Sequence, residues 1–335
     1  MGQRYRQLDS SERDEISRLS AAGCSIRQIA AALDRAPSSV ARELKRNGGK
    51  AGYGPGYAGQ QARARRWTGS KLERNDSLRE QVLTQLIQGW SPEQIVGRSR
   101  RSDGKALIGV ETIYRFVYVQ IARHNDFTWR KYLPRAKSRR GWRPPRGGSP
   151  ALHMSHRRPI QDRPADVDDR LTPGHWEADL MAFARYGQNV LMLHERTSRA
   201  LIGARLPSKE AEPVARAIAD TLLALPEPLR QTLTFDNGTE FARHYQLNAD
   251  GIATYFCDPH APWQKGGIEN AIGRMRRFLP RKTDLASLDN CRFNLCLAAY
   301  NNTPRKCLDW ITPAEAFSQL MLHFKRESTS RPAPG

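Results

Sequence analysis

The sequence predicts an α+β protein of several domains, with helical units in its N-terminal half and a mixed β-sheet with flanking helices in its C-terminal half. Three observations lead to this fold class. The 335 residues are enough for two or three domains. Apolar residues recur at helical spacing up to about residue 120, whereas short apolar runs separated by turn residues begin near residue 172.

Charge is distributed unevenly along the chain. The net charge is +20, from 54 Lys and Arg against 34 Asp and Glu. Residues 1–170 hold 34 basic and 17 acidic side chains, whereas residues 171–335 hold 20 and 17. Because the neutralisation of phosphates releases counterions, such a surplus favours a polyanionic partner.

The cysteines and the apolar runs indicate the compartment. Five cysteines form no CxxC pair and no His/Cys pattern at zinc spacing, so a reducing cytosol is the simplest setting. No run of 18 apolar residues is present, and the first ten residues, MGQRYRQLDS, lack the apolar core of a signal peptide. We therefore expect neither an export signal nor a membrane anchor.

Residues 1–50 are predicted to form a helix-turn-helix DNA-binding domain. Ser25 followed by Gln28 is typical of a capped helix start, and the turn DRAPS separates this helix from a third one that buries Val40 and Leu44. Such a third helix would enter the major groove of DNA. The candidate DNA contacts on its other faces are Ser38, Ser39, Arg42, Lys45 and Arg46.

The basic residues of this third helix differ in their expected roles. Arg42 is placed to reach guanine edges, whereas Lys45 and Arg46 are better placed to hold phosphates. The alternative is a small helical bundle with a solvated basic face. The positive charge of the helix favours DNA binding.

A second helical DNA-binding unit is predicted over residues 77–132. Ser91 and Pro92 form a preferred helix start. The later segment VETIYRFVYVQ predicts a helix on which Thr112 and Arg115 point outward, and we expect these two residues to contact DNA.

Two basic linkers are predicted around this unit, over residues 51–76 and 133–171. The second is rich in Pro, Gly and Arg and is too polar to build a core, so it marks the main domain boundary. Such linkers are either simply solvated or follow the phosphates of bound DNA. Residues 326–335 are predicted to be a disordered tail.

Residues 172–325 are predicted to form the C-terminal domain. The runs GHWEADLMAFA, QNVLMLHERT and RALIGARL, joined by turn signals, are typical of an antiparallel meander. SKEAEPVARAIADTLLALP predicts an amphipathic helix, and QTLTFD and ATYFC predict a fourth and a fifth strand. Together they describe a mixed sheet with helices packed on it.

Three acidic residues occupy distinctive positions in this domain. Asp179 lies inside the first strand, where a charged side chain needs a partner or a metal, Asp236 ends the fourth strand, and Glu269 lies near the start of the helix after the fifth. Each also has an ordinary explanation: an outward-facing position on an edge strand, an Asp-Asn-Gly turn, and a first-turn glutamate that suits the helix dipole. Glu177 and Glu240 are competing carboxylates in the same motifs.

The chain resembles the DDE transposases of bacterial insertion sequences, and most closely the IS30 family, over essentially its whole length. The motifs that carry the resemblance are SIRQIAAALDRAPSSVARELKRN, WSPEQI, ETIYR, GHWEADL, TFDNGTEF and DPHAPWQKGGIEN. The resemblance implies a ribonuclease-H-like fold in which the first and fourth strands are neighbours. It places the acidic triad on Asp179, Asp236 and Glu269, with 32 residues between the last two.

The resemblance also implies a basic residue, one or two turns after the glutamate, that holds a phosphate. Arg276 lies on the same helix face as Glu269 and is our choice, with Arg277 as the alternative. Ile268 stands where the family has a polar residue, a departure that bears on the packing of the helix entry.

The resemblance implies a transposase that binds terminal inverted repeats in double-stranded DNA and then cuts and joins strands at target DNA. The three carboxylates would hold two Mg²⁺ or Mn²⁺ ions, which activate the attacking oxygen and stabilise the leaving one. Two further residues are candidates to contact these ligands without binding the metal themselves. They are Glu177, which lies on the same side of its strand as Asp179, and His260.

We further expect a homodimer or larger assembly on DNA, no membrane association, and a location in the bacterial cytoplasm with the nucleoid. Two alternatives remain at this point. One is an inactive DNA-binding regulator from a decayed element, and the other is a structure-specific nuclease.

Overall fold

The computed structural model describes residues 6–49, 52–66, 69–133, 155–185, 187–259 and 261–330. The chain divides into two compact units, residues 1–74 and 75–335. Among the described residues, no helix is long and apolar enough to cross a membrane.

The first unit is built on three short helices, as predicted: α1 (Ser10–Ala21), α2 (Ile26–Ala32) and α3 (Pro37–Asn47). The predicted capping box is present at the start of α2, where the side chain of Ser25 accepts from the N–H of Gln28 and the Gln28 side chain accepts from the N–H of Ser25. Each of the three helices contributes to the core, which consists of Ile16, Ile29, Ala30 and Val40. The helix-turn-helix fold of this segment is therefore confirmed.

Residues 51–76 were predicted to be a linker, and the structure corrects this. The strands β1 (Gly48–Gly49) and β2 (Gly52–Tyr53) are followed by helices α4 (Pro55–Arg66) and α5 (Lys71–Arg74). Helix α4 packs against α1 and α3, with Ala58 fully buried. A helix that packs through small residues carries little apolar signal, so its charges dominated the sequence pattern.

The second unit begins with four helical segments: α6 (Asp76–Ile87), α7 (Pro92–Asp103), α8 (Val110–His124) and η1 (Phe127–Tyr132). Ser91 caps α7 and Pro92 is its first residue, as predicted. These helices lie in the same compact unit as the sheet. Gln94 donates to the carbonyl of Pro304 at 2.7 Å, and at Gly97 a Cβ atom would lie 2.2 Å from the Trp310 ring.

The sheet has five strands: β3 (His175–Ala182), β4 (Asn189–Glu195), β5 (Leu201–Leu206), β6 (Thr232–Phe235) and β7 (Ala253–Phe256). Their order is β5-β4-β3-β6-β7. The first three strands form an antiparallel meander, whereas β6 and β7 run parallel to β3. The predicted mixed sheet is thus confirmed, with the first and fourth strands as neighbours.

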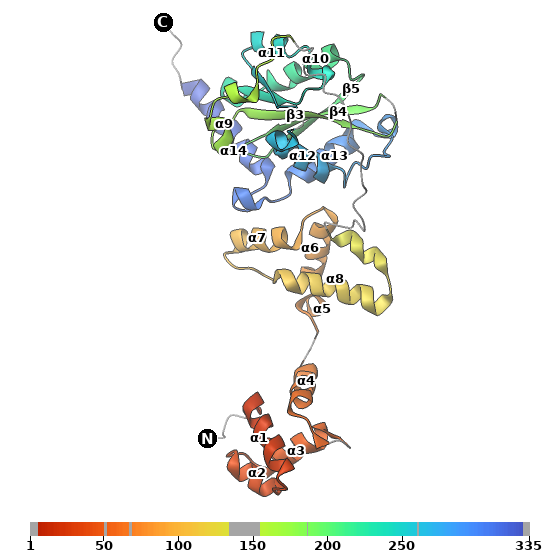
Figure 1. Cartoon of the computed structure of the whole chain (residues 1–335), viewed down its shortest axis with the longest axis vertical. Helices are drawn as coiled ribbons and strands as arrows, with labels where there is room; N and C mark the ends of the chain where they lie inside the picture. The colour runs from red at the N-terminus through yellow and green to blue at the C-terminus, as the bar shows by residue number, and fades with distance from the viewer. Residues whose placement is uncertain are drawn as a thin grey trace. The chain divides into compact units, whose positions relative to one another are not determined.

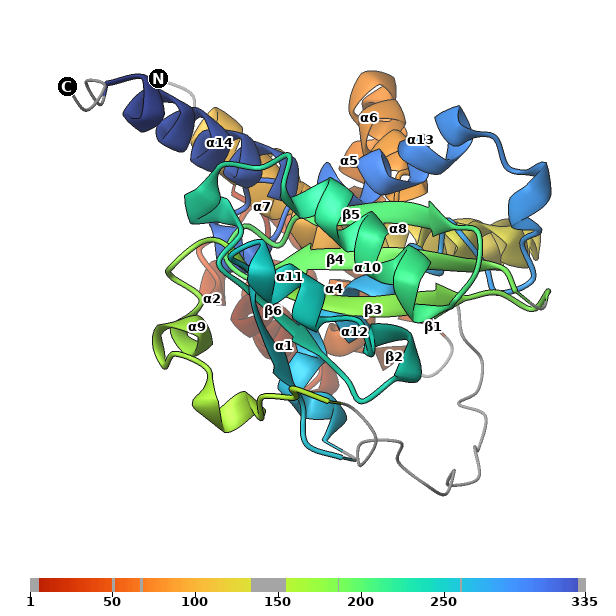
Figure 2. The same ribbon diagram turned by 90° about the horizontal axis from the view of Figure 1, so that it is seen from above.

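Helices cover both faces of the sheet (Figures 1 and 2). Helices α10 (Ala211–Leu222) and α11 (Tyr245–Ala249) lie on one face, and α12 (Gly266–Met275) and α13 (Asn290–Asn301) lie on the other. Trp176 and Ala178 point to the first face and Met181 to the second. Since side chains alternate along a strand, Asp179 shares the α12 face.

Short helical segments connect these elements. They are η3 (Ile160–Asp162), α9 (Asp166–Asp169), η4 (Glu227–Leu229), η5 (Thr239–Phe241), η6 (Pro262–Lys265), η7 (Leu285–Ser287) and η8 (Lys306–Leu308). The chain continues through α14 (Pro313–Ser330), whose Phe317 ring meets the Trp176 ring edge-on at 5.9 Å.

Two further segments differ from the prediction. Of the predicted linker 133–171, residues 155–171 contain η3 and α9 and are bonded to the sheet, where the carbonyl of Arg158 accepts from the N–H of Phe256 in β7 and Arg163 donates to Thr234 in β6. Residues 134–154 lie outside the described residues. The predicted tail 326–335 is helical as far as residue 330, because α14 extends that far, and the rest lies outside the described residues.

The buried His194 predicts a pH dependence of stability. Burial, with the nearby charges of Arg199 and Arg305, lowers the pKa of His194 to about 3, and its Nδ1 has no hydrogen-bond partner among the described residues. An unfolded histidine titrates near pH 6.5, so between that pH and 3 the unfolded chain binds a proton that the folded chain does not. Folding stability therefore falls as the pH drops through this window.

We expect His194→Asn to make this fall less steep, by up to about 1.4 kcal/mol per pH unit. Urea unfolding at pH values from 6.5 down to 4 measures the slope. The matched control is His124→Asn, at an exposed position. Equal slopes in the two variants would contradict the assignment.

Candidate active site and DNA-binding surfaces

Asp179 and Asp236 converge at one edge of the sheet. In the parallel pairing of β3 with β6, Glu177 lies opposite Thr234, so Asp179 and Asp236 each follow two residues later at the same end. Both carboxylates contact one ammonium group. Lys265 Nζ lies 2.7 Å from Asp236 Oδ2 and 3.3 Å from Asp179 Oδ2.

Lys265 is only 4% exposed, and the two aspartates stabilise its charged form. Burial acts to lower the pKa of Lys265, but the charges of Asp179 and Asp236 outweigh it and raise that pKa. Burial also raises the pKa of Asp179, although Lys265 opposes this. Two acidic groups and one cation thus form a compact charged cluster at the sheet's edge.

Asp236 also accepts a hydrogen bond from the backbone of the turn that follows β6. Its Oδ1 accepts from the N–H of Gly238 at 3.2 Å, while Oδ2 faces Lys265. Asn237 Nδ2 donates to the carbonyl of Cys257, which ties the turn to the end of β7. Asp236 is therefore both a turn residue and a member of the cluster.

Glu269 lies in the first turn of α12, beside the cluster and exposed to solvent. Burial raises its pKa, as do the charges of Asp179 and Asp236, and Lys265 opposes the effect. Among the described residues, no three His, Cys, Asp or Glu side chains are close enough together to hold a metal ion. The structure thus brings two of the three predicted ligands together and places the third within electrostatic range.

Glu177 connects β3 to the start of α12. Its side chain is 1% exposed, and its Oε2 accepts from the N–H of Ile268 at 2.6 Å, while Oε1 pairs with Arg196. At Gly267 a Cβ atom would lie 2.6 Å from Glu177 Oε2, so glycine permits this close approach. Glu177 therefore fixes the helix that carries Glu269 to the strand that carries Asp179.

The two arginines predicted to hold phosphates have different surroundings. Arg276 donates to the carbonyl of Ala182 at 2.6 Å, and its guanidinium lies 5.0 Å from the centre of the Phe183 ring, against the end of β3. Arg277 instead donates to the carbonyls of Leu86 and Lys131, both at 3.0 Å. Arg277 thus joins the end of α12 to the preceding helices. Its role as a DNA contact stays a prediction.

Sequence reasoning missed Lys265 as the partner of the two aspartates. Its position four residues before Glu269, at the approach to the helix, was the available signal. His260, predicted to support the ligands, lies outside the described residues. Glu240, the other competing carboxylate, is half-buried, and burial raises its pKa.

Helix α3 presents the predicted DNA contacts of the first unit. Ser38, Arg42, Lys45 and Arg46 are exposed and Ser39 is half-buried, whereas Val40 is in the core. Ser39, Arg42 and Arg46 line a depression of about 290 Å³ together with Arg6 and Arg35. The exposed faces of this helix are therefore basic.

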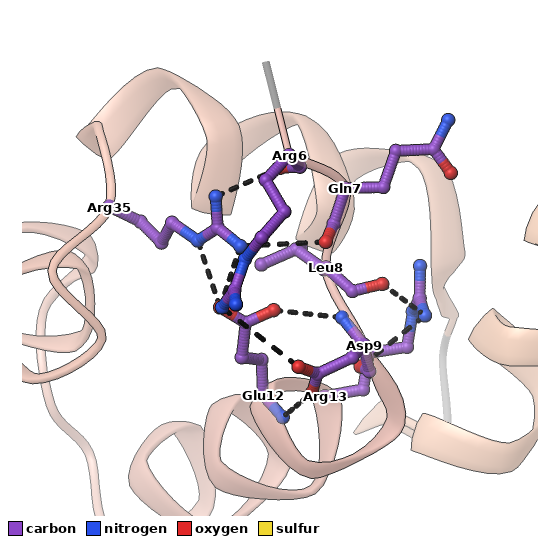
Figure 3. A network of polar contacts seen from close by, with 7 residues as sticks. All are labelled: Arg6, Gln7, Leu8, Asp9, Glu12, Arg13 and Arg35. Atoms are coloured by element: carbon purple, nitrogen blue, oxygen red, sulfur yellow. Dashed lines mark hydrogen bonds and ion pairs between the residues drawn. The ribbon is translucent and has the colours of Figure 1, made fainter. Parts of the chain in front are cut away.

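A polar network fixes the segment before α1 against this depression (Figure 3). Arg35 donates to Glu12 and to the carbonyls of Arg6 and Gln7, and Arg13 donates to the carbonyl of Leu8. Burial opposes the ionisation of Glu12, but the N–H of Asp9 and the guanidinium of Arg35 together lower its pKa. Arg6 is thereby held near α3.

In the second helical unit, the predicted contacts lie on α8. Thr112 is half-buried near the helix start, and Arg115 is exposed and pairs with Glu111 at 2.9 Å. An exposed pair of this kind contributes little to stability, so Arg115 can exchange its partner for a phosphate.

Known proteins match both parts of the chain. Residues 4–47 match the family model described as "Helix-turn-helix domain". A transposase (InsI) of insertion sequence element IS30A from Escherichia coli is 39% identical over 316 residues, which cover 92% of this chain and 82% of that protein. The transposase of IS1086 from Cupriavidus metallidurans is 37% identical, over 95% of this chain and 96% of its own length.

Two further matches are more distant. The transposase of IS4351 from Bacteroides fragilis is 32% identical, over 94% of this chain and 96% of its own length. Among solved structures, the catalytic core domain of BIV integrase covers 47% of this chain and 99% of its own, at 19% identity and a TM-score of 0.35, too low to bear on function. By the identity and coverage of its bacterial relatives, the chain belongs to the IS30 family of insertion sequence transposases.

Proposed function

We propose that this transposase cuts DNA at the ends of its element and joins them to target DNA, with Asp179, Asp236 and Glu269 holding two Mg²⁺ or Mn²⁺ ions. The observation that carries the proposal is the convergence of Asp179 and Asp236 on one buried cation. Two carboxylates held this close repel each other unless a positive charge lies between them. A site built in this way is suited to cations.

The donor set fits a hard divalent ion. Mg²⁺ prefers carboxylate oxygens, with one or two carboxylates per ion, and Asp179 and Asp236 supply such a pair. Glu269 is close enough to feel their charge and would complete the set from α12. When bound, the two ions would activate the attacking oxygen and stabilise the leaving one in an in-line displacement of a phosphodiester.

The chain's own residues would orient the reacting strands. Glu177 keeps α12 against β3 through the N–H of Ile268, so that the acids on the two elements keep their spacing. Arg276 is the C-cap residue of α12, seven residues after Glu269, and we assign it to a DNA phosphate. That contact requires its guanidinium to exchange the carbonyl of Ala182 for a phosphate oxygen.

The helical units would select the DNA. We assign recognition of the terminal inverted repeats to α3, through Arg42 on base edges and Lys45 and Arg46 on phosphates, with Ser38 and Ser39 at the helix start. Thr112 and Arg115 on α8 would add contacts from the second unit. Because two element ends have to be brought together, a homodimer or larger assembly on DNA is part of the proposal.

Removal of one acid should separate cutting from binding. We expect Asp236→Asn to lower strand cleavage by at least about a hundredfold, because a neutral amide is a much poorer ligand for a divalent ion, and to leave binding of the element ends intact. Purified protein is incubated with a supercoiled plasmid carrying the flanking repeats, in Mg²⁺ or EDTA, and nicks and joined strands are read on a sequencing gel.

The matched control for this experiment is Asp220→Asn, an exposed aspartate of α10 on the opposite face of the sheet. It should cut and join like the unmodified chain. If Asp236→Asn folds but no longer binds the ends, the proposed division between recognition and chemistry is wrong.

Two substitutions in α3 should act differently on DNA recognition. Arg42→Gln should weaken binding to the inverted repeat by about 1–3 kcal/mol and relax the preference over unrelated DNA. Lys45→Gln should weaken binding to the repeat and binding to unrelated DNA by a similar factor. It should also reduce the slope of log K against log salt concentration by about 1. Fluorescence anisotropy with repeat and scrambled duplexes measures both, and identical behaviour of the two variants would argue against α3 as the reading helix.

The cation between the aspartates predicts a coupling of stability to metal. In EDTA, Lys265→Met leaves two neighbouring carboxylates without their counter-charge and should cost about 1–3 kcal/mol, an effect reduced by the partial exposure of both aspartates. Mg²⁺ should then raise the melting temperature of Lys265→Met more than that of the unmodified chain. Lys282→Met, at an exposed position, is the control, and an equal Mg²⁺ response in all three proteins would contradict the expectation.

A further inference from the structure

A large cleft lies within the second unit, between the helices α7 and α8 and the α12 side of the sheet domain. Its volume is about 950 Å³, which is in the size range of ligand sites. Side chains of three kinds line it: aromatic rings, basic groups and small or polar residues of α12. We refer to it as the α8–α12 cleft.

The lining is strongly basic. Arg274, Arg277, Arg305 and Lys306 contribute four positive charges, and Glu93 contributes one negative charge. Arg277 is engaged with backbone carbonyls, but Arg274 and Lys306 are exposed. The cleft therefore attracts an anionic partner.

Arg305 is a buried cation without a carboxylate partner. Its side chain donates to the carbonyl of Tyr300 at 3.1 Å and lies over the Tyr300 ring at 4.4 Å, and Arg305 is only 7% exposed. Burial lowers its pKa to about 10, and no carboxylate in the described part of the chain forms an ion pair with it. A buried charge of this kind is costly unless an anion offsets it, and a phosphate in the cleft would supply one.

The aromatic side of the cleft is formed by α8. The rings of Tyr114 and Tyr118 stack at 6.5 Å between centroids, with 18° between their planes, and Tyr118 is 57% exposed. Aromatic rings beside basic groups are typical of surfaces that bind unpaired nucleic acid strands, because unpaired bases stack on them. A duplex offers its base faces only at its ends.

Residues of α12 that follow Glu269 form one side of the cleft. Asn270 and Gly273 of α12 line it, and Asn270 directly follows Glu269. A Cβ atom at Gly273 would meet nothing within 4 Å, so the helix surface is open there. A strand bound between this surface and the rings of α8 would lie against the helix that carries Glu269.

We propose that the α8–α12 cleft binds an unpaired DNA strand next to the site of cutting, with Arg274, Arg305 and Lys306 on its phosphates and Tyr118 stacked on a base. The inference rests on the proposed function, since it takes the acids beside the cleft to be the site of strand cutting. It assigns a DNA-binding role to α8 that differs from reading a duplex sequence.

The test uses the full chain in EDTA, so that binding is measured without cutting. Two fluorescent probes share one duplex sequence, and one of them carries a single-stranded 3′ overhang. The contribution of the other helical units to duplex binding is common to both probes. Anisotropy titrations at several salt concentrations give the affinity and its salt dependence.

We expect Tyr118→Ala to weaken binding of the overhang probe by roughly 5- to 150-fold and to leave binding of the blunt probe almost unchanged. Tyr118→Phe keeps the ring and should bind both probes like the unmodified chain. Arg274→Gln and Lys306→Gln should each lower the salt slope for the overhang probe by about 0.7. Arg216→Gln removes the same charge from α10 on the opposite face and should change neither.

Equal losses on the blunt and overhang probes would overturn the proposal, as would equal losses in Tyr118→Ala and Tyr118→Phe. No loss in any cleft variant would also overturn it. Metal-dependent cutting of the plasmid by the unmodified chain reports on the proposed function separately. A chain that cuts but shows no cleft effect would refute the cleft alone.

Discussion

The parallel pairing of β3 with β6 is the constraint on which the rest of the site depends. The register that sets Glu177 opposite Thr234 brings Asp179 and Asp236 to one edge, although 56 residues separate them in the sequence. Two carboxylates at this distance repel each other, and the ammonium of Lys265 offsets the repulsion. Strand pairing therefore brings two negative charges together, and a buried lysine offsets their repulsion.

The same strand also positions the helix that carries the third acid. Glu177 and Asp179 point to the same face of β3, so the buried Glu177 accepts from the start of α12 while Asp179 faces the cluster. The charge of Glu177 is paired with Arg196, and Gly267 leaves room for its side chain. A buried carboxylate in this setting is costly to leave unpaired, which makes the link between strand and helix specific.

The helices α6 to α8 and the sheet belong to one compact part of the chain. Hydrogen bonds and close packing both join them. Arg277 donates to two carbonyls of the helical unit, Gln94 donates to the carbonyl of Pro304, and Gly97 lets α7 approach the Trp310 ring. These contacts bring the rings of α8 and the basic residues of the loops after α12 into one cleft. The cleft is thus a surface that neither part forms alone.

The sequence by itself determined the order of helices and strands, the basic N-terminal half and the three acids, because apolar periodicity, turn residues and charge are local properties of the chain. The capped start of α2, the meander, and the positions of Asp179 inside the first strand and Asp236 at the end of the fourth could all be predicted in this way. Ala58 shows the limit of that approach, since a helix packed through small residues leaves almost no periodic signal.

Only the tertiary structure decided which distant groups meet. It placed Lys265 between the two aspartates, turned Arg277 toward backbone carbonyls of the preceding helical segments, and left Arg305 buried without a carboxylate partner among the described residues. Each of these outcomes depends on contacts between segments far apart in the chain, and the energy of a charged side chain is set by the groups around it. Local sequence patterns do not contain that information, because burial and pairing arise only when the strands and helices pack.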